Sequence, residues 1–177
     1  MKGVETKLKK GNQILFNKES EELQELLELM NKQNRLTMVL WAFDCVQKPI
    51  SILNEKLPET TLFDEALSIC KDWAQGKNTM DVARKTILKV HAMAKETDDK
   101  EIKALIHAVG QALSTVHVAT HAKGLCFYEL TAIVRSFGNR QYEEAVHLRI
   151  AEYIDTLIYW QKHAGSLEVQ WSDFLRK

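Results

Sequence analysis

The chain has 177 residues, 45% of them hydrophobic, with seven glycines and two prolines, and this composition predicts one compact, helix-rich domain. Its 24 Lys and Arg residues balance 24 Asp and Glu residues, so the overall charge does not favour a nucleic-acid or membrane partner. The first residues lack the apolar core of a signal peptide, and no uncharged run approaches the length of a membrane helix. We therefore expect a cytoplasmic protein.

The cysteines point to the same compartment. Cys45, Cys70 and Cys126 lack the spacing of metal ligands and lie in apolar, helix-like runs. An odd number of such residues predicts free, buried thiols in a reducing environment.

The first part of the chain predicts an arm followed by helices. Residues 1–17 are rich in lysine and weakly patterned, so we expect an N-terminal arm that docks on a single helical domain formed by residues 18–177. From Glu19 onward the apolar residues keep helical spacing, which predicts an amphipathic outer helix. Residues 35–48 are apolar on nearly all sides and predict a buried helix that kinks or continues as far as Leu57.

The later segments also carry helical signals. Residues 62–75 predict a helix that ends at Gly76, and residues 78–95 and 140–163 predict two more. Trp171 stands near an irregular C-terminal segment and is expected to be exposed. Because no alternating strand pattern and no fixed repeat occur, we predict an all-α, single-domain bundle of six or seven helices.

The remaining stretch, residues 98–137, is predicted to be one long helix at the centre of this bundle. It contains no proline, and Asp98 with Glu101 favours a capped start. At 100° per residue, its small and polar side chains gather on one strip while Ala, Val, Ile and Leu cover the rest. The strip consists of His107, Gly110, Gln111, Ser114, His117 and His121.

Two interpretations of this strip remain open. His117 and His121 are four residues apart, so on one helix they could share a metal ion such as zinc, with His91 or Asp44 completing the site. Alternatively, the imidazoles hydrogen-bond neighbouring polar groups in a close helix crossing that Gly110 permits. The candidate polar seam or ligand site comprises Asp44, His91, Gly110, Gln111, Ser114, His117 and His121.

Other chemical motifs are weak. Glu144 and His147 form one E-x-x-H pair, but di-iron bundles need two, and this pair lies on a helix covered with charge. The sequence has no glycine-flanked serine, no Cys-x-x-Cys and no phosphate-binding glycine loop. We therefore predict no catalytic residue and no cofactor, a divalent metal being the alternative.

The segment from Ala108 to Gly124, AVGQALSTVHVATHAKG, resembles a motif of a bacterial helical family described as putative immunity proteins of polymorphic-toxin systems, the immunity-five-like family. Further similar pieces follow the family's order: the tryptophan–alanine–x–aspartate core at residues 41–44, Trp73 with Gly76, and His91. The resemblance covers residues 36–132. One departure is the segment after Pro58, Glu-Thr-Thr-Leu-Phe-Asp, where the family carries arginines, so no role of those arginines transfers.

The resemblance implies a non-catalytic protein that binds and neutralises a cognate protein toxin. From the charge balance we expect no nucleic-acid and no membrane partner. The alternative hypothesis is a metal-binding helical protein, or a metal-dependent enzyme, that uses a His117/His121 site.

Overall fold

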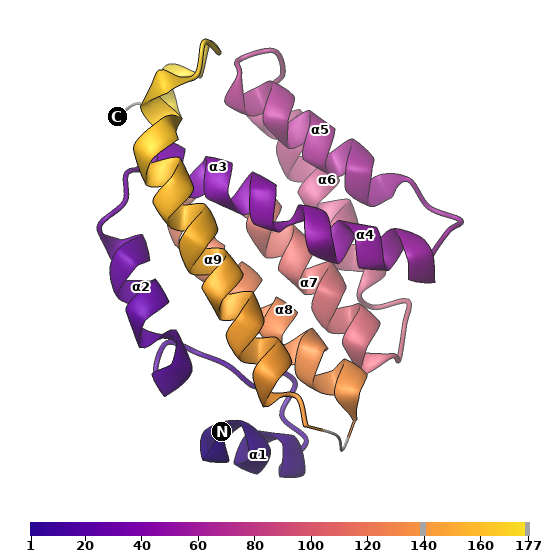
Figure 1. The fold of residues 1–177 in the computed structure, drawn as a ribbon. Coiled ribbons are helices and arrows are strands. Elements are labelled where there is room, and N and C mark those ends of the chain that lie inside the picture. The colour runs from indigo at the N-terminus through magenta and orange to yellow at the C-terminus, as the bar shows by residue number, and fades with distance from the viewer. Residues whose placement is uncertain (139–140, 176–177) are drawn as a thin grey trace.

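The computed structural model describes residues 1–138 and 141–175, and these residues contain α-helices and short 3₁₀ turns but no strand. The predicted all-α class is thus confirmed (Figure 1). The described part has nine α-helices where six or seven were predicted: α1 (Lys2–Lys9), α2 (Gln24–Asn31), α3 (Arg35–Cys45), α4 (Gln47–Lys56), α5 (Leu62–Ala74), α6 (Met80–Met93), α7 (Lys100–Ser114), α8 (Ala122–Phe137) and α9 (Glu143–His163).

Helix α7 forms the centre of the bundle, as the apolar pattern indicated. It packs against α3, α4, α5, α6 and α8, while α9 lies across α3 and beside α2 and α8. In Figure 1, α5 and α6 lie on one side of α7, and α9 with α2 covers the other.

The prediction of a single helix over residues 98–137 is wrong, because the chain turns back after Ser114. Helix α7 ends there, a 3₁₀ turn spans Ala119–His121, and α8 returns alongside α7 (Figure 1). Ser114 Oγ donates to the Gly110 carbonyl at 2.7 Å, a local bond that competes with continued helix. Arg35 donates to the carbonyls of Val116 and His117 at 2.8 and 2.6 Å, so the helix can end without leaving those groups unpaired.

The helices begin and end close to the capping residues that the sequence indicated. Thr79 and Asp99 accept hydrogen bonds from the first turns of α6 and α7, each one residue from the predicted cap. Gly76 and Gly138 follow α5 and α8 with φ of +75° and +60°, a conformation that favours glycine. The predicted start of the last long helix at Arg140 lies outside the described residues.

Helices α3 and α4 form a nearly continuous apolar segment, Arg35–Lys56. By length and composition this segment could cross a membrane, but 67% of its most apolar 18-residue window is buried inside the bundle. Burial of that extent is what the core helix of a folded domain shows. Pro49 is the third residue of α4, where the missing N–H costs little.

Both ends of the chain are tied to the bundle. Leu15 and Phe16 are fully buried, and the Leu15 N–H donates to Thr131 of α8 at 3.0 Å. At the other end, Trp171 is only 8% exposed, so the prediction of an exposed tryptophan is wrong. The next residue, Ser172, donates its N–H to the Ala74 carbonyl at 2.8 Å and thereby pins this segment against the end of α5.

Candidate functional site

A polar seam runs between α6, α7 and α8, and two glycines make it possible. The imidazole of His91 on α6 lies against Gly110 on α7 so closely that a Cβ at Gly110 would sit 2.3 Å from His91 Cε1. The side chain of Gln111 fills the corresponding place over Gly124 on α8, where a Cβ would lie 2.5 Å from its Oε1. Each glycine therefore receives a polar side chain from the neighbouring helix.

Hydrogen bonds within the seam join its members in pairs. His91 Nδ1 lies 3.4 Å from His107 Nδ1, so one of these nitrogens donates to the other. His121 Nδ1 lies 2.8 Å from Gln111 Oε1 and therefore carries the proton that this bond needs. Burial is the largest cause that lowers the pKa of His91 and of His107, which favours neutral rings at pH 7.

Two predicted members of the site lie elsewhere. The helix break turns His117 toward α5, where its ring packs on Trp73 at a centroid distance of 4.5 Å. Burial lowers the pKa of His117, and its Nε2 is buried without a hydrogen-bond partner. Asp44 is exposed on α3 and accepts a hydrogen bond from Trp160 Nε1 at 3.1 Å, so its partner is a tryptophan rather than a histidine.

The geometry on which the metal alternative depended is not present. His117 follows the end of α7 and His121 closes the 3₁₀ turn, so the two do not share one helix face. Among the described residues, no group of three or more His, Cys, Asp or Glu side chains is arranged to hold a metal ion. The structure thus brings together His91, Gly110, Gln111 and His121, with Ser114 beside them, between α6, α7 and α8.

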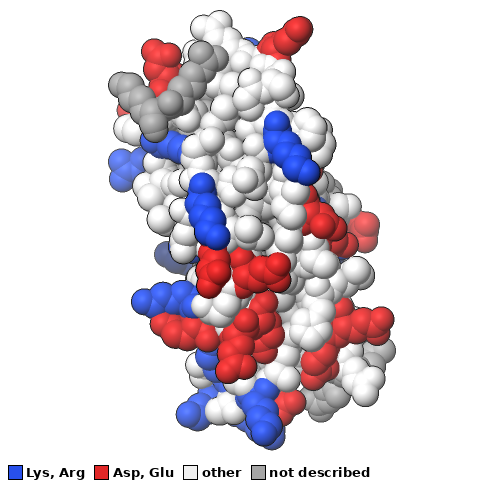
Figure 2. All heavy atoms as spheres, turned by 60° about the vertical axis from the view of Figure 1, so that its left-hand side comes forward, with Lys and Arg blue, Asp and Glu red and all other residues white. Residues whose placement is uncertain are grey.

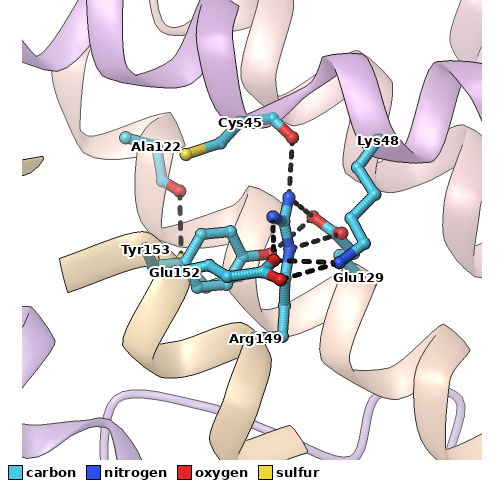
Figure 3. A network of polar contacts seen from close by, with 8 residues as sticks. Cys45, Lys48, Ala122, Glu129, Arg149, Glu152 and Tyr153 are labelled. Carbon is cyan, nitrogen blue, oxygen red and sulfur yellow. Dashed lines mark hydrogen bonds and ion pairs between the residues drawn. The ribbon is translucent and has the colours of Figure 1, made fainter. Parts of the chain in front are cut away.

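A second polar cluster, the Glu129 network, was not predicted; its buried members Glu129, Arg149 and Tyr153 are drawn in Figure 3. The guanidinium of Arg149 on α9 faces the carboxylate of Glu129 on α8, with Nε to Oε1 at 2.8 Å and Nη2 to Oε2 at 3.1 Å. The two side chains are 7% and 2% exposed. The hydroxyl of Tyr153 donates to the same carboxylate at 2.5 Å.

Arg149 also reaches two further groups. It donates to the Cys45 carbonyl at the end of α3 at 2.7 Å and to Glu152 at 2.8 Å, and Lys48 on α4 binds Glu152 from the solvent side. Burial raises the pKa of Glu129, while the charge of Arg149 and the bonds from Arg149 and Tyr153 oppose that rise. We assign an ion pair here because three donors converge on one carboxylate. The network joins α9 to α3, α4 and α8.

Sequence signals for this network existed. Glu129 is the single acid in the apolar run of α8, as Asp44 is in α3, and a carboxylate buried in that way requires a partner. Arg149 and Tyr153 are four residues apart and so point to the same side of α9. Helical spacing alone could not show which of the two lone acids is buried.

The outer side of α9 carries a stripe of exposed residues, here called the α9 face. Leu148 and Tyr159 are 62% and 50% exposed. The helical spacing of Glu144, Leu148, Ala151, Asp155 and Tyr159 places all five, which are exposed, on one side of the helix. Large apolar side chains therefore alternate with carboxylates along this stripe.

The helix beside this face adds to the negative charge. Glu25 and Glu28 are exposed on α2, which packs against α9. Figure 2 turns this side of the bundle forward and shows acidic side chains gathered across its middle and lower part. A protein whose formal net charge is zero thus carries a locally acidic surface.

Comparison with known proteins gives one match. A family model described as "Imm-5 like putative immunity protein" matches residues 28–156, which include the polar seam, the Glu129 network and most of the α9 face. No curated protein and no solved structure matches the chain. Since the match covers well over half of the 177 residues, the chain belongs to the Imm-5 like putative immunity protein family.

Proposed function

We propose that this protein is an immunity protein that binds a cognate toxin in the cytoplasm and neutralises it without catalysis. The observation that carries the proposal is the family match over residues 28–156. Three buried, unpaired cysteines fit a reducing compartment.

The use of the polar groups supports a binding function. The polar side chains of the seam and of the Glu129 network bind one another: His91 pairs with His107, Gln111 with His121, and Glu129 with Arg149. A general base or nucleophile needs a polar atom that faces a substrate. Buried pairs of this kind stabilise helix packing instead.

The α9 face is the surface that we propose for toxin contact. Exposed Leu148 and Tyr159 supply apolar area, and aromatic residues are frequent binding hot spots. The carboxylates of Glu144 and Asp155 beside them would complement a basic surface and speed association with it. The toxin's contact site is therefore proposed to be positively charged around an apolar centre.

Co-expression provides the test. The protein encoded next to this gene would be produced in a bacterial host with and without the present chain, and survival would be scored together with complex formation by calorimetry. Rescue of growth and a 1:1 complex are expected. If the neighbour is toxic but neither rescue nor binding occurs, the proposal is wrong.

A matched pair of variants tests the surface separately. Leu148→Glu should weaken toxin binding at least about tenfold, as expected for loss of a central apolar contact. Leu88→Glu on α6 is the control, because Leu88 is similarly exposed at 57% but lies on another helix. Equal effects of the two substitutions would exclude the α9 face and leave the immunity function itself untouched.

A further inference from the structure

A small cavity lies where the start of α7 meets the end of α8. Its volume is about 210 Å³, and the residues lining it include Lys100 and Lys103 on α7 and Arg135 on α8. The turn after Ser114 makes α7 and α8 antiparallel neighbours, which is why the first turn of one and the last turn of the other share this place. Three cations therefore converge on one cavity.

These cations lack anionic partners in the described part of the chain. None of the three forms an ion pair, and neither lysine ammonium group donates a hydrogen bond to a described residue. Arg135 uses Nη2 to bind the Asn12 carbonyl at 2.7 Å, which holds the segment after α1 at the cavity edge. Among the residues that the structure describes, Nε and Nη1 of Arg135 have no hydrogen-bond partner.

The charge of the cavity matches a dianion. Three positive charges from Lys100, Lys103 and Arg135 against the single carboxylate of Asp98 leave a formal charge of +2. A phosphate monoester carries about −1.5 to −2 charges near pH 7 and three acceptor oxygens.

The cavity lining adds two aromatic rings, one of which carries a second ring nitrogen. His107 and Tyr128 pack against each other with ring centroids 5.0 Å apart and ring planes tilted by 37°, and both line the cavity. Since His107 Nδ1 faces His91, its second nitrogen is left for the cavity. When His91 donates in that pair, His107 carries its proton on Nε2 and can donate to a bound oxygen.

We propose that this cavity binds a phosphate group, with Lys100, Lys103 and Arg135 around the oxygens and the His107–Tyr128 pair beneath the attached organic group. This site is separate from the α9 face and does not depend on the immunity function.

The test is a titration of the isotope-labelled protein by two-dimensional NMR at constant ionic strength, with inorganic phosphate and with phenyl phosphate as probes. Saturable shifts are expected at the backbone amides of residues 11–13, 100–107 and 128–135, with a Kd below about 1 mM. The double substitution Lys100→Met and Lys103→Met should weaken binding at least tenfold. Neither lysine side chain makes a hydrogen bond or ion pair to a described residue, so the NMR spectrum of this variant should show the same fold as the natural protein. If it does not, the single substitution Lys103→Met replaces the double one in the titration.

The control removes two lysines from α6, Lys85→Met and Lys89→Met, which are exposed and do not line the cavity. Tighter binding of phenyl phosphate would identify an organic monoester as the ligand, and equal binding would identify the free anion; both support a phosphate site. An absence of saturable shifts with both probes overturns the proposal. So does an equal loss of affinity in the α6 control, because that result would mean non-specific attraction to surface charge.

Discussion

Removal of the Glu129 carboxylate is the most direct test of what holds α9 in place. In Glu129→Ala, the buried Arg149 guanidinium loses two hydrogen bonds and the Tyr153 hydroxyl loses its acceptor. Breaking a buried ion pair by deleting one partner costs about 3 to 5 kcal/mol, since the other charge stays buried and unpaired. This is a large share of the roughly 5 to 15 kcal/mol that stabilises a typical domain.

The assay is urea unfolding followed by far-ultraviolet circular dichroism, with thermal unfolding as a second measure. A loss of that size should lower the melting temperature by about 6 to 20 °C, at about 2 to 4 °C per kcal/mol for a domain of this length. Glu129→Leu combined with Arg149→Met should recover most of the loss, because apolar residues can replace a buried pair. Full recovery is not expected, since the Cys45 carbonyl also loses its donor.

Lys48→Met is the matched control, because it breaks an ion pair at the edge of the same network. The Lys48 and Glu152 side chains are 50% and 37% exposed, so their pair should contribute less than about 1 kcal/mol. Glu129→Ala is expected to lower the free energy of unfolding by much more than Lys48→Met does. If the two losses are equal, and if Glu129→Leu with Arg149→Met is no more stable than Glu129→Ala, the buried ion pair does not hold α9 in place.

Three further predictions concern the seam, the pH dependence and the thiols. Gly110→Ala should destabilise the protein because the added Cβ would overlap the His91 ring. In a His91→Ala background the same substitution should instead stabilise by up to about 1 kcal/mol through helix propensity, as should the control Gly3→Ala, where nothing lies within 4 Å of the added Cβ. Urea unfolding of all four variants checks this. Burial lowers the folded-state pKa of His91, His107 and His117, so on acidification the unfolded chain takes up protons before the folded protein does, below about pH 6.5. The free energy of unfolding should therefore fall as the pH is lowered from 7.5 to 5.5. An unchanged free energy of unfolding across that range would contradict the buried, neutral state of these histidines. Burial also raises the pKa of the cysteine thiols, to about 12 for Cys70. A thiol reagent should therefore modify the native protein slowly and reach all three thiols only after denaturation. Rapid modification of the native protein would show that the thiols are accessible.

Much of the fold could be predicted from local signals. Helical spacing of apolar residues and glycines after helix ends are properties of short segments, and the structure follows them at Gly76 and at Gly138. The turn after Ser114 could not be predicted in this way. In the turn, Arg35, about 80 residues earlier in the chain, binds the carbonyls of Val116 and His117 in the segment between α7 and α8.

The candidate site shows the same division between local and distant causes. One of the two interpretations of the strip placed a close helix crossing at Gly110, and the imidazole of His91 does lie there. His117 was misplaced because its position was derived from a continuous helix. Asp44 and Glu129 look alike in sequence, each a lone acid in an apolar run, but only Glu129 has an arginine from another helix beside it. Which acid is buried is therefore a property of helix packing.

The Glu129 network and the α9 face occupy successive positions on one helix, and this arrangement bears on binding. Leu148 points outward and Arg149, the next residue, points into the bundle, where it contacts groups on α3 and α8. A contact surface on a helix held at several points loses little conformational freedom when a partner binds, and that lowers the entropic cost of association. A purely apolar contact would allow α9 to slide along its neighbours, whereas the paired bonds between Arg149 and Glu129 are directional. If α9 binds the toxin as proposed, Glu129→Ala should weaken that binding as well as stability. The Glu129→Leu and Arg149→Met protein, which recovers most of the stability, separates the two effects. If that double variant binds the toxin as tightly as the natural protein, the network serves stability alone.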